Sequence, residues 1–160
     1  MKKIIFFFSL TLVSGLLQVT LLENIKIFGI KPDILLISIL LASLNFTLRW
    51  ALAVSLFAGF LKDVFCAWGF GINSLLFALW SFLTFKLASK VTMDTDIAKV
   101  VLVFVVSILH NSVMSLFSIG SGNPVSAAIL SNIIIQSIYT AAVYPLFSLI
   151  TRPLETFDLA

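Results

Sequence analysis

Long runs of apolar residues, separated by short polar breaks, extend along the whole chain. The runs predict six helices with the approximate bounds Ile4–Leu22, Ile34–Leu48, Trp50–Phe65, Ile72–Ala88, Ile97–Ile119 and Val125–Ile150. None of them shows the alternation of a barrel strand, and backbone amides in lipid must find their partners within the protein. The pattern therefore predicts an all-α polytopic membrane protein with six transmembrane helices.

Composition supports a membrane protein of one domain. Hydrophobic residues make up 61% of the 160 residues and charged residues 11%, against about 45–50% and about 25% in soluble proteins. A soluble chain of this length could not hide so much apolar surface. Because no linker or charge run divides the sequence, we expect a single transmembrane domain over residues 1–160. The apolar run that follows Lys2 and Lys3 has no small-x-small cleavage site, so we interpret it as a retained first helix rather than a signal peptide.

The second and third predicted helices are short for a membrane span, which needs about 20 residues. They meet at the sequence NFTLRW, where Asn45 and Arg49 permit a turn. The alternative is one long helix through this region, with Arg49 near its middle. We favour a hairpin, because a charge in the centre of a span is costly.

Orientation follows from the distribution of basic residues, which concentrate in cytoplasmic loops. If the N-terminus is cytoplasmic, seven of the ten Lys and Arg residues fall inside: Lys2, Lys3, Arg49, Lys86, Lys90, Lys99 and Arg152. Lys26, Lys31 and Lys62 fall outside. Six helices with both termini in the cytoplasm are therefore expected.

Residues able to perform catalysis are few. The sequence has one His and one Cys and no phosphate-binding loop, paired-carboxylate motif or metal-ligand spacing. We interpret Cys66 as a packing residue and His110 as a hydrogen-bonded packing residue, although an ionisable group within a membrane helix can also be functional. The positive charge forms no basic patch. We predict no enzyme activity, no cofactor, no metal and no nucleic-acid partner.

Polar residues recur at helical spacing in three of the predicted helices. These stripes are Thr11, Ser14 and Gln18, then Ser107, Asn111, Ser115 and Ser118, and finally Asn132, Gln136 and Thr140. One interpretation is that they join helices through hydrogen bonds, each worth roughly 0.6–2 kcal/mol. The other is that they line a pocket for a solute.

A charged pair stands near the end of the third predicted helix, in the stretch GFLKDVFCAWGFGINSLLF. A carboxylate at this position opposes the negative end of the helix dipole, so Asp63 needs a partner. The candidates are Lys62, the backbone amides of Gly69–Gly71 and the side chain of Asn73. The stretch predicts a turn at the membrane surface that Asp63 latches to the fourth helix.

The segments KPDILLI and GFLKDVFCAWGFGINSLLFAL resemble the rod shape-determining protein MreD family. In that family a Pro-Asp pair opens the second helix, and a Gly-x-x-x-Asp segment precedes a glycine-containing turn into the fourth. The matching residues, which we take as a structural or partner-binding motif, are Pro32, Asp33, Gly59, Asp63, Gly69, Gly71 and Asn73. Lys62 and Phe70 depart from the family pattern, which usually has an apolar residue and Leu there.

The resemblance implies a non-catalytic subunit of the bacterial cell-elongation machinery in the cytoplasmic membrane. Such proteins bind the membrane-anchored MreC and, through it, associate with MreB, RodA and a class B penicillin-binding transpeptidase. Membrane lipids are the remaining partners.

The family also resembles the S components of energy-coupling-factor transporters in fold, which gives the alternative of a substrate-binding transporter subunit. S components usually carry small residues spaced four apart on the first helix, for docking to their transport partner. Here that face shows Phe7, Thr11, Gly15 and Val19. We therefore favour the scaffold function.

Overall fold

The computed structural model describes residues 2–20, 30–65, 71–91, 95–122 and 129–155. Within these ranges the fold consists of six helices: α1 (Lys2–Thr20), α2 (Ile34–Asn45), α3 (Leu48–Phe65), α4 (Ile72–Ala88), α5 (Asp96–Gly120) and α6 (Ile129–Glu155). The helices predicted from the apolar runs are confirmed in number and order. The predicted ends at Leu22 and Val125 lie outside the described residues.

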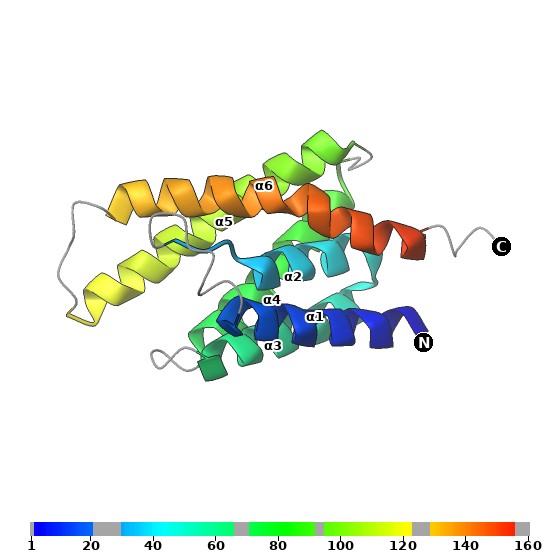
Figure 1. Cartoon of the computed structure of the whole chain (residues 1–160), viewed down its shortest axis with the longest axis horizontal. Helices are drawn as coiled ribbons and strands as arrows, with labels where there is room; N and C mark the ends of the chain where they lie inside the picture. The colour runs from blue at the N-terminus through cyan, green and yellow to red at the C-terminus, as the bar shows by residue number, and fades with distance from the viewer. Residues whose placement is uncertain (1, 21–29, 66–70, 92–94, 123–128, 156–160) are drawn as a thin grey trace.

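Helix α2 forms the centre of the bundle. It contacts each of the other five helices, and every residue from Ile34 to Ser43 is buried. In Figure 1, α2 lies between α6 on one side and α1 on the other. A helix that is apolar on all sides is expected to be enclosed by other helices.

The break between α2 and α3 confirms the hairpin. Phe46 has an extended backbone, with φ −121° and ψ 162°, and the Asn45 side chain donates a hydrogen bond to the carbonyl oxygen of Leu41. The carbonyl of Thr47 accepts hydrogen bonds from Trp50 and Ala51 and so begins α3. The expectation that the second helix extends to Leu48 was wrong, because these contacts end α2 at Asn45. The alternative of one long helix is excluded.

Large apolar side chains are exposed on each of the five outer helices. Examples are Ile5 on α1, Leu56 on α3, Leu75 on α4, Ile97 on α5 and Leu130 on α6. A soluble surface would not carry so many, whereas lipid-facing helices do. Three helices, over Lys3–Thr20, Asp96–Gly120 and Ile129–Thr151, are long and apolar enough to cross a membrane, while α2 and α4 are apolar but shorter. The chain is a helical membrane protein.

Candidate functional site

The Asp63 carboxylate joins the end of α3 to the first turn of α4. Its Oδ1 accepts hydrogen bonds from the backbone and side-chain nitrogens of Asn73, at 3.1 and 2.9 Å. Its Oδ2 accepts from the backbone nitrogen and hydroxyl of Ser74, at 3.0 and 2.6 Å. The first amides of a helix lack partners within that helix, and a negative charge there is favourable. Asp63 therefore caps α4 from a neighbouring helix. Gly71, the N-cap residue of α4, has no side chain that could cap the helix itself.

Two glycines shape this contact, which we call the α3–α4 latch (Gly59, Asp63, Gly71, Asn73 and Ser74). A Cβ atom on Gly59 would lie 2.8 Å from the nitrogen of Ser74, 2.9 Å from the carbonyl oxygen of Asn73, and closer still to Ser74 Cα. Only a residue without a side chain lets α3 approach α4 this closely. Gly71 has φ +95°, a left-handed conformation that glycine adopts without strain.

The partner expected for Asp63 is only partly as predicted. The hydrogen bond from Asn73 is present, and Ser74 supplies two further donors that the sequence argument missed. The prediction that Lys62 pairs with Asp63 was wrong, because the Lys62 ammonium group forms an ion pair with Asp33 instead. Gly69 lies outside the described residues, as do Cys66 and Phe70.

Asp33 organises a second polar contact, where α2 begins. Its Oδ1 accepts hydrogen bonds from the Leu36 amide, at 3.1 Å, and from the Gln18 side chain, at 3.4 Å. Its backbone nitrogen donates to the Thr140 hydroxyl at 3.0 Å. Gln18 in turn accepts a hydrogen bond from the backbone nitrogen of Leu35, so side chains of two segments satisfy the first amides of α2.

The Lys62 ammonium group completes this contact. It forms an ion pair with Oδ2 of Asp33 and a hydrogen bond of 3.0 Å with Nε2 of His110. It also lies 4.9 Å from the centre of the Phe77 ring, within the range of a cation–π interaction. A lysine has no acceptor, so His110 accepts through Nε2 and carries its ring hydrogen on Nδ1 in this arrangement.

We call these side chains the α2 network: Gln18, Asp33, Lys62, Phe77, His110 and Thr140. They come from α1, the start of α2, α3, α4, α5 and α6, so all six helices meet there. Asp33 and Thr140 are fully buried and His110 nearly so. A buried charge is tolerated when it is paired and hydrogen-bonded. The predicted interpretation of His110 as a hydrogen-bonded residue is confirmed.

The residues of the sequence motif thus fall into two neighbouring groups. Pro32 is buried beside Asp33 in the α2 network, and the described glycines, Asp63 and Asn73 form the α3–α4 latch. Lys62 and Asp63 are adjacent in sequence, but Lys62 belongs to the α2 network and Asp63 to the α3–α4 latch. Sequence reasoning considered Lys62 only as a partner of Asp63, although Asp33, Lys62 and His110 are ionisable residues in apolar surroundings, which was a signal that they pair with one another.

The polar stripes differ in what their side chains contact, and only the interpretation that they join helices is confirmed. Gln18 and Thr140 join helices through hydrogen bonds to Asp33. A cavity of about 310 Å³ lies between α5 and α6, and its polar lining consists of Asn111, Ser115, Ser118, Asn132 and Gln136. Among the described residues, no group of three or more His, Cys, Asp and Glu side chains could hold a metal ion.

Comparison with known proteins places these features in a family. Searches of curated proteins and of solved structures returned no match. The family of the rod shape-determining protein MreD matches residues 1–153, which is nearly the whole chain. The chain therefore belongs to the MreD family of rod shape-determining membrane proteins.

Proposed function

We propose that this chain is a non-catalytic membrane subunit of the bacterial machinery that elongates rod-shaped cells. In this proposal it binds MreC and helps to organise lateral peptidoglycan synthesis. Through MreC it associates indirectly with MreB, RodA and a class B penicillin-binding transpeptidase. The observation that carries the proposal is the family match over residues 1–153.

The use of the polar side chains supports a binding role rather than a chemical one. Asp33, Lys62 and Asp63 all form hydrogen bonds with residues of other helices. Such contacts hold a lipid-surrounded surface in one shape. A rigid apolar surface suits recognition by another membrane protein.

The proposed topology is six spans in the cytoplasmic membrane of a bacterium, with both termini in the cytoplasm. It is supported by the excess of Lys and Arg in the segments assigned to the inside. The start of α1 and the end of α6 lie at the same end of the molecule (Figure 1), as an even number of spans requires. Single cysteines at positions 94 and 158, on a Cys66→Ser background, should be unreactive to an external probe. Labelling from outside would overturn the orientation.

The transporter alternative receives no support from the comparisons or from α1. Three of the four positions on the face expected to dock a transport partner are turned inward, since Phe7, Thr11 and Gly15 are buried and Val19 alone is exposed. A Cβ atom on Gly15 would lie 3.5 Å from both Leu61 and Phe65 of α3. The spacing that S components use for docking is here occupied by packing within the fold. The resemblance to the S-component fold therefore adds no function to the proposal.

Co-purification tests the proposal directly. The affinity-tagged chain is extracted from native membranes in a mild non-ionic detergent, beside a tagged polytopic protein of similar size as the control. We expect MreC to remain with the chain in near-equal amounts and to be absent from the control. A chain that accumulates folded in the membrane yet retains no MreC would refute the proposal.

The His110→Ala variant separates binding from chemistry. A packing role predicts that cells carrying this variant keep their rod shape and that MreC still co-purifies. Complete loss of shape, with the variant present in the membrane and MreC still bound, would indicate a chemical role for the imidazole.

A further inference from the structure

Helices α5 and α6 extend past the helix that joins them to the rest of the fold. Their main contacts are with each other and with α2. Asp33, where α2 begins, lies beside His110 of α5 and Thr140 of α6. From that level, residues 111–120 of α5 and 129–139 of α6 continue beyond the start of α2 (Figure 1). We call these two segments, each about 15 Å long, the α5–α6 tip.

The cavity of about 310 Å³ between α5 and α6 lies within this tip, and its polar lining is neutral. That lining consists of the hydroxyl and amide side chains of Asn111, Ser115, Ser118, Asn132 and Gln136. The described residues that line the cavity include no charged group, so it does not suit an ion. Hydroxyl and amide groups act both as donors and as acceptors. The lining is therefore complementary to other neutral groups of the same kind.

Three of these side chains have their whole hydrogen-bonding capacity available. Within the described part of the chain, the side chains of Ser115, Asn132 and Gln136 form no hydrogen bond. Asn111 uses one N–H for Ser107, at 3.4 Å, and keeps its carbonyl oxygen. Asn132 is exposed and the other two are half-buried. Polar groups in lipid are costly unless they find a partner, so these side chains favour an occupant that pairs with them.

The surface around the cavity shows what kind of molecule that occupant is. Leu116 and Phe117 on α5, and Leu130 and Ile134 on α6, are exposed large apolar residues. An occupant that contacts this surface lies among lipid chains, where a polypeptide is helical. A helix with its side chains is about 10–12 Å across. The cavity therefore admits side chains of such a helix, while its backbone lies along the outside.

We propose that the α5–α6 tip docks a membrane-spanning helix of a partner protein. That helix inserts hydroxyl or amide side chains between α5 and α6, where Ser115 and Asn132 form hydrogen bonds with them. Hydrogen bonds of this kind join helices within membranes. The inference rests on the proposed function, which supplies MreC as the partner, and it assigns the surface that the membrane anchor of MreC contacts.

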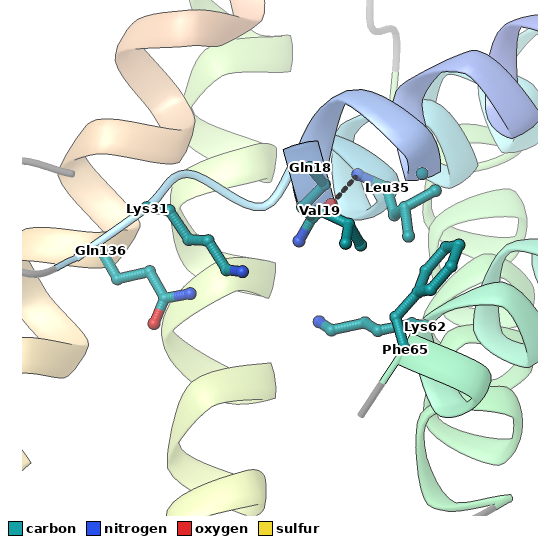
Figure 2. A pocket seen from close by; sticks show the side chains of 8 residues that line it. Gln18, Val19, Lys31, Leu35, Lys62, Phe65 and Gln136 are labelled. Carbon is teal, nitrogen blue, oxygen red and sulfur yellow. Dashed lines mark hydrogen bonds between the residues drawn. The ribbon is translucent and has the colours of Figure 1, made fainter. Parts of the chain in front are cut away.

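Gln136 lines two cavities, which decides where the test is made. The second cavity, of about 180 Å³, is lined by Gln18 and Lys62 of the α2 network. Figure 2 shows Gln136 on the opposite side of this second cavity from Gln18 and Lys62. A substitution at Gln136 would therefore alter the surroundings of the α2 network as well. Ser115 and Asn132 line only the cavity in the tip, so the variants are made there.

Site-specific crosslinking in native membranes locates the docked helix. A photoreactive amino acid at position 132 should crosslink to MreC after irradiation, as detected by immunoblotting. The control carries the same amino acid at position 79 of α4, where Leu79 is also exposed. We expect no crosslink to MreC from that position.

Substitutions test the hydrogen bonds. Ser115→Ala combined with Asn132→Leu should lower the amount of MreC that co-purifies about tenfold. The unfolding midpoint of this double variant should not fall, because neither side chain forms a hydrogen bond within the described fold. Asn132→Gln keeps an amide at that position and should retain most of the MreC. Ser112→Ala, at a position of α5 that does not line the cavity, should have no effect.

The outcomes separate this inference from the proposed function. Equal retention of MreC by the wild type and the double variant would overturn the inference alone. So would a crosslink from position 79 as strong as that from position 132, or crosslinks from position 132 only to lipid or to a second copy of the chain. A lowered unfolding midpoint in the double variant would assign both residues to internal packing instead. A wild-type chain that retains no MreC would refute the proposed function and this inference together.

Discussion

Asp33 and Asp63 are both buried carboxylates at the first turn of a helix, but their charges are balanced in different ways. Asp33 caps its own helix and faces the Lys62 ammonium group. Asp63 caps a neighbouring helix and is held by four neutral donors from Asn73 and Ser74. The positive end of the α4 dipole supplies the remaining compensation for Asp63, a contribution of about 0.3–2 kcal/mol.

The two carboxylates also differ in the number of helices that they connect. The latch connects one pair of helices, α3 and α4, whose backbones also meet at Gly59. The α2 network connects all six helices around one ion pair. Neutral donors are sufficient where two helices meet, whereas the network also contains the partly buried Lys62 ammonium group. Loss of one partner should therefore be more damaging in the network than in the latch.

The largest expected effect on stability comes from the same substitution, Asp to Asn, made at position 33 and at position 63. Asp33→Asn removes the negative charge that faces Lys62 and leaves a partly buried cation without its counter-charge. It should therefore cost up to about 3–5 kcal/mol of unfolding free energy. Asp63→Asn leaves only neutral donors unsatisfied and should cost about 1–3 kcal/mol. Both values are measured by reversible unfolding in mixed micelles.

A double variant provides the control for this comparison. Lys62→Met combined with Asp33→Asn removes both charges together, so it should be more stable than the sum of the two single losses predicts. Equal costs for Asp33→Asn and Asp63→Asn would show that the ion pair is no more important than the latch.

Gly59→Ala tests the close approach of α3 and α4. The new methyl group would meet the backbone of Ser74, which cannot rotate away, so the helices must separate. We expect a loss of about 1–3 kcal/mol from overpacking. Gly120→Ala is the matched control, because a Cβ atom there meets nothing within 4 Å. A Gly59→Ala variant as stable as this control would contradict the described contact.

A double-mutant cycle on Asp63→Ala and Asn73→Ala tests whether the two residues act as one latch. Each single variant leaves buried groups unpaired, at a cost of roughly 1–3 kcal/mol. The double variant should cost less than the sum, because both substitutions disrupt the same contact. The cycle is measured on the unfolding midpoint, with MreC pull-down on the same samples. Strictly additive losses would mean that the two residues do not cooperate.

Ser74→Ala should have the smallest effect. It removes the 2.6 Å hydroxyl contact to Asp63 and keeps the backbone donor of the same residue. We expect a loss of about 1 kcal/mol, near the net value of a single hydrogen bond. A loss of stability as large as that of Asp63→Ala would show that this hydroxyl group contributes most of the stabilisation from the latch.

The sequence predicts the helices well because polar residues follow most of their apolar runs, as Ser89 and Lys90 follow Ala88. It also predicts the hydrogen bond between Asp63 and Asn73, which are ten residues apart across one turn. The ion pair between Asp33 and Lys62 spans 29 residues and depends on how α2 and α3 lie in space. The early end of α2 depends on the extended backbone of Phe46, and Phe46 itself gives no sign of it in the sequence.

The short length of α2 has a consequence for how the chain enters the membrane during synthesis. Its 12 residues reach about 18 Å, and a hydrocarbon layer is about 30 Å thick. An insertion machinery that selects segments by length and apolarity would not retain α2 alone as a span. We expect α2 and α3 to partition into the bilayer together as a helical hairpin, so that Asp33 arrives beside the lysine that neutralises it.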